Sequence, residues 1–148
     1  MNVPFHRPLY DDADERMLVS SFRSGKLVGD GEYTRRATEF LTGLLGVRSV
    51  LLTTSCTHAL ELAMMVLDIR AGDEVIIPSF TFVSTANSIM RQGARVIFAD
   101  ITPSTLTLDI EDVRRRITSR TRAIVPVVYA GVPPEMDELM TLARDRGI

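Results

Sequence analysis

The stretch AGDEVIIPSFTFVSTANSIMRQGARVIFADI, residues 71–101, decides the fold of this chain. Residues 74–77 form a β-branched run that Pro78 stops, as expected of a buried strand. Residues 83–91 have helical character, and the segment GARVIFADI, residues 93–101, is a second apolar run. A strand, a connecting helix and another strand form a βαβ unit. This stretch therefore predicts a parallel sheet.

The same alternation continues on both sides of this unit. Residues 49–52 predict a short buried strand, and Asp109 is expected to cap a helix that runs to about residue 117. Because the strands are continuously apolar, we expect helices on both faces of the sheet, which is a three-layer αβα fold of the α/β class with a mostly parallel sheet. The other predicted elements are helices at 12–22, 34–45, 57–67 and 133–148 and a strand at 122–131. Residues 1–47 are predicted to form an arm and helices, and residues 48–148 the βα units.

The composition is that of one globular domain and excludes several classes of protein. The 148 residues are 45% hydrophobic and 24% charged, with a formal net charge of −2. The longest basic run is Arg114–Arg116, so nothing predicts nucleic-acid binding. No apolar stretch approaches the ~20 residues of a membrane span. The N-terminus lacks the apolar core of a secretory signal, and we expect a cytoplasmic protein.

Few residues could support metal or thiol chemistry. His6 and His58 are far apart in the sequence, and no spacing typical of metal ligands occurs. Cys56 is the only cysteine, which excludes an internal disulfide and fits a reducing compartment. We expect Cys56 to be a small buried residue.

A run of small, mostly hydroxyl-bearing residues, 53–57, opens directly into a predicted helix. The unpaired N–H groups and the dipole of a helix N-terminus favour an anion, and hydroxyl groups add donors. Ser55 or Thr57 could instead serve only as the N-cap of the helix. The residues themselves leave both interpretations open. Neither Gly-x-Gly-x-x-Gly nor Gly-x-x-x-x-Gly-Lys occurs, so dinucleotide and Walker-type sites have little support.

Two aromatic residues follow the strand at 74–77. Carboxyl ends of parallel strands share one edge of a sheet, where ligands bind in open α/β folds. An aromatic face beside a phosphate site would suit a flat, phosphorylated heteroaromatic cofactor. We expect Phe82 to have this role and Phe80 to belong to the core.

Four stretches resemble the N-terminal part of the sugar-nucleotide aminotransferases of the DegT/DnrJ/EryC1/StrS family. The likeness runs through the whole chain in order, and it implies part of the large domain of the pyridoxal 5′-phosphate (PLP) dependent transferase fold type I. The stretches are SGKLVGDGEYTRRATEFL (24–41), LLTTSCTHALELAMMVLDI (51–69), GDEVIIPSFTFVSTANSIMRQGARVIFADI (72–101) and RAIVPVVYAGVPPEMD (122–137).

The resemblance also implies roles for residues that bind the cofactor, PLP. Thr57 and the backbone at His58 match positions that hold the cofactor phosphate, with Ser55 beside them, and Phe82 matches the aromatic that stacks on the ring. Val128 stands where the family usually has histidine, which removes a polar group near the site.

The resemblance further implies a reaction and partners. The family transfers an amino group from glutamate to a nucleotide-linked sugar, and the phrases SGKLVGDG and SCTHALE favour a dTDP-linked 4-keto-6-deoxy sugar of surface polysaccharide, such as lipopolysaccharide, biosynthesis. Arg7, Lys26 and Tyr33 are candidate substrate contacts by analogy with the N-terminal arm and the loop after it. Members are dimers, so a homodimer is expected.

Lysine is almost absent. Lys26 is the only lysine among 17 basic residues, and it lies in a glycine-rich loop before the first predicted strand. Family catalysis needs a lysine that binds the cofactor covalently and an acid beside the pyridine nitrogen, both in a later region. We therefore expect an N-terminal portion that is inactive alone and self-associates. The alternatives are an inactive truncated remnant and a small α/β ligand-binding module.

Overall fold

The computed structural model describes residue 4 and residues 6–148, which divide into two compact units. The first unit ends at Leu52 and the second is Thr53–Ile148. No helix in the part of the chain that the structure describes is long and apolar enough to cross a membrane. The elements are α1 (Asp12–Arg23), α2 (Glu32–Leu45), α3 (Cys56–Val66), β1 (Glu74–Pro78), α4 (Val83–Met90), β2 (Arg95–Ala99), β3 (Ile101–Thr102), β4 (Thr107–Leu108), α5 (Ile110–Arg116), β5 (Thr121–Ile124) and α6 (Met136–Arg146).

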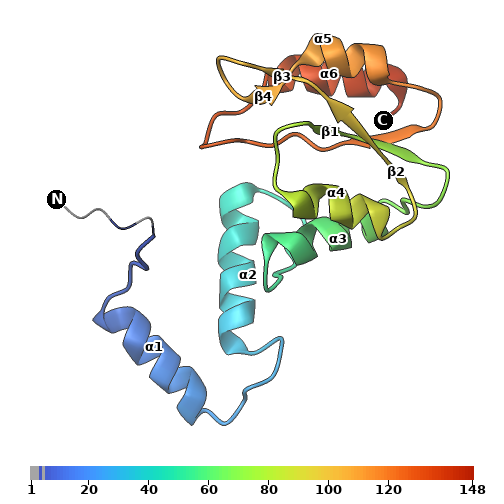
Figure 1. Cartoon of the computed structure of the whole chain (residues 1–148). Coiled ribbons are helices and arrows are strands. Elements are labelled where there is room, and N and C mark those ends of the chain that lie inside the picture. Colours follow the sequence, from blue (N-terminus) through green and yellow to red (C-terminus); the bar gives the residue numbers. More distant parts are fainter. Residues whose placement is uncertain (1–3, 5) are drawn as a thin grey trace. The chain divides into compact units, whose positions relative to one another are not determined.

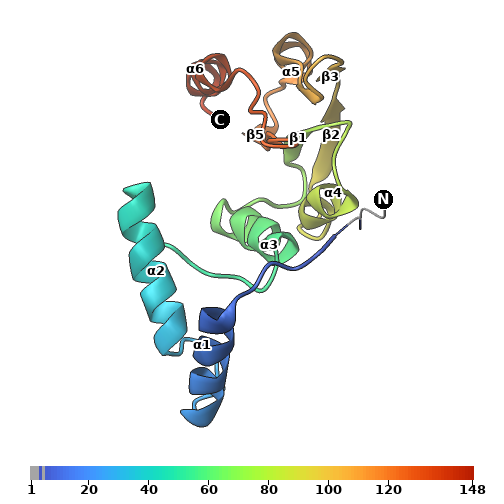
Figure 2. The same ribbon diagram turned by 90° about the vertical axis from the view of Figure 1, so that its left-hand side faces the viewer.

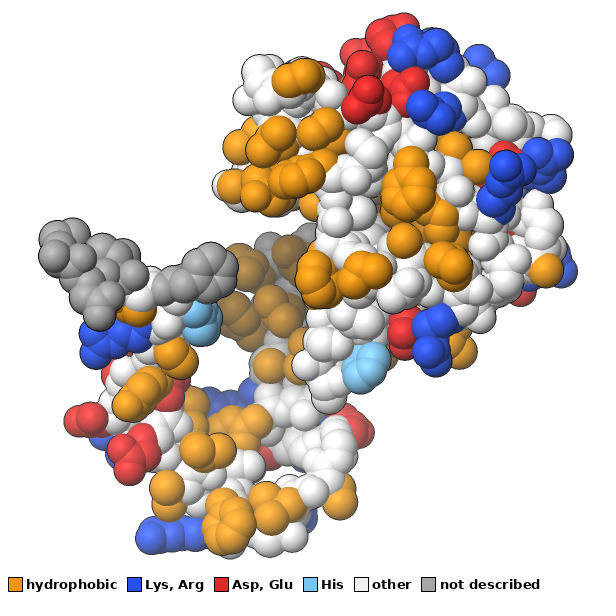
Figure 3. Space-filling view, viewed as in Figure 1, with side chains coloured by type: hydrophobic (Ala, Val, Ile, Leu, Met, Phe, Trp, Pro, Cys, Tyr) orange, Lys and Arg blue, Asp and Glu red, His pale blue; other side chains and the backbone are white. Residues whose placement is uncertain are grey.

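The first unit contains two amphipathic helices with well-defined ends. The Asp11 carboxylate accepts hydrogen bonds from the backbone of Ala13 and Asp14, and the Asp14 carboxylate accepts one from the Asp11 N–H, which is a capping box. Helix α2 ends at Gly46, in the left-handed region at φ 63°. Neither helix has a buried residue, and Figure 3 shows orange apolar side chains at the surface of both.

The sheet of the second unit is parallel, with strand order β2-β1-β5. Ile76 in the central strand β1 pairs with Ile97 of β2 and with Ile124 of β5. Helices α3 and α4 cover one face and α5 and α6 cover the other, as Figures 1 and 2 show from two directions. The predicted three-layer α/β arrangement is therefore present in this unit.

Strand β1 contributes to two separate hydrophobic cores because successive side chains of a strand point to opposite faces. Val75 and Ile77 belong to the core with α3 and α4, which contains Met64 and Ile89. Ile76 belongs to the core with α5 and α6. Every residue of β1 is buried, so the continuously apolar run did identify a strand covered on both faces.

Residues 49–52 are not a strand, and that prediction was wrong. They are irregular, and Leu51 is 72% exposed. An apolar run becomes a strand only when a neighbouring strand pairs with it, and no strand that the structure describes lies alongside this one.

The strand predicted at 122–131 is shorter in the structure, and a small hairpin was not predicted. The Val125 N–H still donates to the Ile76 carbonyl at 2.9 Å, but Pro126 has no N–H with which to continue the ladder. Strands β3 and β4 pair antiparallel, with Leu106 at φ 60° before β4. A leucine in the left-handed region gives no sequence signal of a turn.

Buried Glu74 holds the start of β1. Its carboxylate accepts hydrogen bonds from the Thr118 hydroxyl at 2.6 Å and from Nε and Nη2 of Arg120 at 3.0 and 2.7 Å. The hydrogen bond from Thr118, followed by that from Arg120, lowers the pKa of Glu74. This cluster ties β1 to the loop that precedes β5.

Buried Asp112 holds α5 against the end of β2. Its carboxylate accepts hydrogen bonds from the side chains of Arg116 and Arg115 and from the backbone N–H of Asp100, the last at 2.7 Å. The hydrogen bond from Arg116, followed by that from the Asp100 N–H, lowers the pKa of Asp112 to about 2. The helix itself begins after Asp109, whose carboxylate accepts from Glu111 N–H, so the predicted cap is confirmed.

Candidate functional site

Three local hydrogen bonds hold the start of helix α3. The Ser55 hydroxyl accepts from the His58 N–H at 3.1 Å, so Ser55 is the N-cap. The Thr53 hydroxyl donates to the Ser55 carbonyl at 2.9 Å, and the Thr54 hydroxyl lies 2.6 Å from Nδ1 of His58. The capping interpretation therefore holds for Ser55 and not for Thr57. The first-turn N–H groups of Cys56 and Thr57 have no possible partner within the helix.

A cavity of about 770 Å³ lies at the carboxyl end of the sheet, within the second unit. Three segments of the chain form it: the first turns of α3, the segment after β1 with the first turn of α4, and the segment after β5. The residues are Cys56, Thr57, Leu60, Phe80, Thr81, Phe82, Ser84, Thr85, Val125, Pro126, Val127, Val128 and Tyr129. The predicted meeting of the two loops at one edge of the sheet is therefore present.

Aromatic side chains form much of the cavity surface. Phe82 immediately precedes α4 and is 75% exposed, which agrees with its predicted place outside the core. Phe80 was expected in the core, but it is 41% exposed and lines the cavity. Its ring meets Tyr129 edge to face, with 4.9 Å between centroids and 66° between planes. Phe80 follows the end of β1, beyond the helical layers that bury the strand.

The chemistry of this lining fits a phosphorylated aromatic ligand. Half-buried Thr57 provides a hydroxyl beside the α3 N-terminus, and Phe82 provides an open ring face in the same cavity. The described lining contains no charged side chain, so it can bind and orient a ligand but supplies no amine or carboxylate for its chemistry. Val128 is 54% exposed and lines the cavity, so the position where the resembling family usually has histidine is apolar here, as the sequence indicated.

The predicted site residues fall into two groups. Thr57 and Phe82 line the cavity, while Ser55 and His58 lie beside it at the start of α3. The three candidate substrate contacts belong to the first unit, and their role remains a prediction. They are Arg7, Lys26 and Tyr33.

Two further cavity residues were missed or misjudged. Cys56 was expected to be buried, but it is exposed, because it is the first residue of α3 and lines the cavity. Tyr129 received no role from the sequence, and the only local turn signal near it is Gly131.

Residues 9–148 match the family described as the DegT/DnrJ/EryC1/StrS aminotransferase family. The 3-amino-5-hydroxybenzoate synthase of Amycolatopsis mediterranei is 38% identical over 143 residues, which are 95% of this chain and 37% of that protein. The GDP-perosamine synthase of Vibrio cholerae is 33% identical over 146 residues, covering 99% of this chain and 40% of that protein. The chain thus spans about two fifths of the length of these relatives.

Solved structures agree with the sequence relatives. The crystal structure of 3-amino-5-hydroxybenzoic acid synthase superposes with a TM-score of 0.91 at 36% identity, covering 95% of this chain and 37% of that one. Spr1654 of Streptococcus pneumoniae, assigned as a sugar aminotransferase and solved in its PLP-form, gives a TM-score of 0.93 at 29% identity, covering 99% of this chain and 37% of that one. The expected fold, that of PLP-dependent fold type I, is confirmed by these neighbours.

Proposed function

Because this chain belongs to the DegT/DnrJ/EryC1/StrS aminotransferase family, we propose that it forms the part of a PLP-dependent sugar aminotransferase that holds the cofactor phosphate and one face of its ring. The observation that carries this proposal is that one cavity joins the N-terminus of α3, the Thr57 hydroxyl and the face of Phe82. A phosphate site and a ring platform are the two features that such a cofactor needs from its binding protein.

At the phosphate end, the Thr57 hydroxyl and the first-turn N–H groups of α3 donate to the anion, and the helix dipole adds to the attraction. The hydrogen bond from the His58 N–H to Ser55 fixes the helix start, so these donors are in place before the ligand arrives. His58 thus acts through its backbone.

At the ring end, Phe82 provides the stacking surface. Its carbonyl accepts a hydrogen bond from the Thr85 N–H at 3.0 Å, which holds the residue at the entrance to α4. The bound cofactor supplies the electron sink for amino transfer. The residues of this cavity position it and exclude water from one ring face.

The substrates that we propose are more specific than the family membership alone indicates. The likeness to GDP-perosamine synthase and to an assigned sugar aminotransferase supports a nucleotide-linked sugar as amino acceptor. The motif resemblance favours a dTDP-linked 4-keto-6-deoxy sugar and glutamate as donor, in surface polysaccharide biosynthesis in the cytoplasm. Arg7, Lys26 and Tyr33 are then the substrate contacts from the first unit.

We further propose that the chain assembles with a second copy. Phe40 and Leu44 on α2 are both 67% exposed, and apolar side chains at this spacing form one side of a helix. Covering that side with another chain would remove it from water, so we expect a species larger than a monomer in sedimentation experiments at low micromolar concentration.

The test of the phosphate site is reversible PLP binding to the 148-residue chain. We expect Thr57→Ala to weaken binding about tenfold, or about 1 to 2 kcal/mol, because a hydrogen bond to a charged group is lost. Thr141→Ala is the matched control, since its hydroxyl bonds to the Asp137 carbonyl on α6. Equal affinity of Thr57→Ala and the unmodified chain would show that Thr57 does not bind phosphate.

Borohydride treatment of the PLP complex tests the role of the lone lysine. We expect no saturable adduct at Lys26, because this residue is assigned to substrate contact and not to covalent binding. A stoichiometric adduct at Lys26 that inorganic phosphate prevents would contradict this assignment. The sugar is tested in the whole protein by mass spectrometric detection of amino transfer from glutamate to dTDP-linked and GDP-linked 4-keto-6-deoxy sugars.

A further inference from the structure

Tyr129 is a partly exposed aromatic residue on the cavity wall to which the proposed function assigns no role. It follows β5, whereas its partner Phe80 follows β1, the neighbouring parallel strand. The edge-to-face contact between the two rings, at 4.9 Å, therefore joins the two loops that leave the same edge of the sheet. The pair forms an aromatic corner of the cavity, and we call it the Phe80–Tyr129 corner.

The backbone after Tyr129 is fixed by a tight turn. Ala130 and Gly131 have φ of 50° and 83°, and the Val132 N–H donates to the Tyr129 carbonyl at 2.9 Å. Tyr129 and Val132 also form a β-bridge, so these residues make a two-residue turn of the type I′ kind. Alanine is sterically disfavoured in this region, so the surrounding structure must hold Ala130 in this conformation. The turn fixes the backbone next to Tyr129, whose side chain lines the cavity.

The surroundings of Tyr129 determine what it can recognise. Val125, Val127 and Val128, from the same segment after β5, also line the cavity, so this part of the lining is apolar. An aromatic ring in an apolar lining favours the flat ring of a ligand, because the two rings bury a large area and can pack edge to face or face to face. The polar donors lie at the start of α3, so a phosphorylated ring compound would contact both parts.

We propose that Tyr129 is a specificity-determining residue of this cavity, whose ring, held by Phe80, packs against the ring of the phosphorylated ligand bound at the start of α3. The inference rests on the proposed function of the cavity. It assigns the recognition to the aromatic ring and not to the phenolic hydroxyl. Tyr129 therefore favours ligands that carry a ring over phosphate alone.

The experiment compares PLP and inorganic phosphate as probes of the same chain. We expect Tyr129→Ala to weaken PLP binding about tenfold and to leave phosphate binding unchanged. Tyr129→Phe, the conservative variant, should retain PLP affinity within about twofold, and Phe80→Ala should weaken PLP binding less than Tyr129→Ala. Circular dichroism of each variant checks that the fold is kept.

Tyrosine fluorescence gives an independent readout. The chain has no tryptophan and three tyrosines, of which only Tyr129 is in the second unit. PLP should quench part of the tyrosine emission of the unmodified chain, and this part should be absent in Tyr129→Phe although PLP still binds. If PLP quenches the emission of Tyr129→Phe as much as that of the unmodified chain, the placement of Tyr129 against the ligand is overturned.

The outcomes separate the two proposals. If Tyr129→Ala binds PLP as the unmodified chain does, while Thr57→Ala does not, only the inference about Tyr129 is overturned. If Tyr129→Ala loses phosphate as well as PLP, the residue supports the fold of the site and the inference is also overturned. If the unmodified chain binds neither probe, the proposed function fails and this inference fails with it.

Discussion

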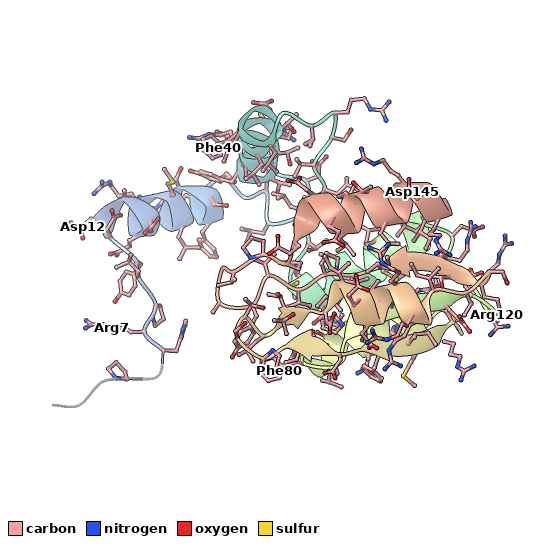
Figure 4. All side chains as sticks on the ribbon, turned by 90° about the horizontal axis from the view of Figure 1, so that it is seen from above. Arg7, Asp12, Phe40, Phe80, Arg120 and Asp145 are labelled. Carbon is pink, nitrogen blue, oxygen red and sulfur yellow. The ribbon has the colours of Figure 1, made fainter. Side chains whose placement is uncertain are left out.

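The two ends of strand β1 differ in how they are held. At the amino end, buried Glu74 accepts three side-chain hydrogen bonds from Thr118 and Arg120. At the carboxyl end, the chain opens into a cavity where Phe80 makes a single aromatic contact and Phe82 is exposed. Figure 4 shows Arg120 and Phe80 at opposite ends of the sheet. One strand thus carries stability at its start and a binding surface beyond its end, as is usual for parallel sheets.

The largest expected effect is at the amino end of β1. Arg120→Ala should lower the free energy of unfolding by about 3 kcal/mol, because it leaves Glu74, only 2% exposed, with an unpaired charge. Urea unfolding measures this loss. The control is Arg122→Ala, which changes an exposed arginine two residues further along, on β5. If the two variants lose the same stability, the hydrogen bonds from Arg120 to Glu74 do not stabilise the amino end of β1 in the way described.

A pH titration gives the next largest effect, at the end of the neighbouring strand β2. The folded pKa of Asp112, about 2, lies below its unfolded value of 3.8, so the charged carboxylate stabilises the fold above pH 4. This contribution, about 2 kcal/mol, should be lost as the pH falls from 4 towards 2. Thermal unfolding across this range measures it. Asp112→Asn should lose less stability between pH 4 and pH 2, because only Glu74 and other groups then contribute to the loss. If the variant loses as much stability as the unmodified chain, Asp112 is not a cause.

The smallest effect is expected in the turn that follows Tyr129. Ala130→Gly should raise the free energy of unfolding by about 0.5 kcal/mol, because glycine adopts a φ of 50° without steric cost but gains freedom when unfolded. Ala143→Gly in helix α6 is the matched control and should be destabilising by about 1 kcal/mol. Chemical denaturation of both variants measures the difference. A destabilised Ala130→Gly would show that strain in this turn is negligible.

Local signals in the sequence predicted much of the second unit. The β-branched run at 74–77 predicted β1, and Asp109 predicted the start of α5. Both signals are contained in a few consecutive residues, so they can be recognised without knowledge of the fold. Residues 49–52 were wrongly predicted as a strand, since pairing depends on a partner that local sequence does not show. The β3–β4 hairpin was missed because Leu106 is an unusual residue at positive φ.

The part of the candidate site that follows from sheet topology could be predicted from the sequence. The hydroxyl-rich entry to α3 and the aromatic residues after β1 could be assigned to one edge of a parallel sheet, and both line the cavity. The contact between Phe80 and Tyr129 could not be predicted, because it joins loops that are distant in sequence and depends on the turn at Ala130. For that reason Phe80 was expected in the core and Tyr129 was left without a role.

The alternation of side chains along β1 has a consequence for cooperativity. Val75 and Ile77 belong to one core and Ile76 to the other, so a single strand is part of both. Loss of β1 from the sheet would expose both cores together. The second unit should therefore unfold as one cooperative body, with the amides of β1 among the last to exchange with solvent.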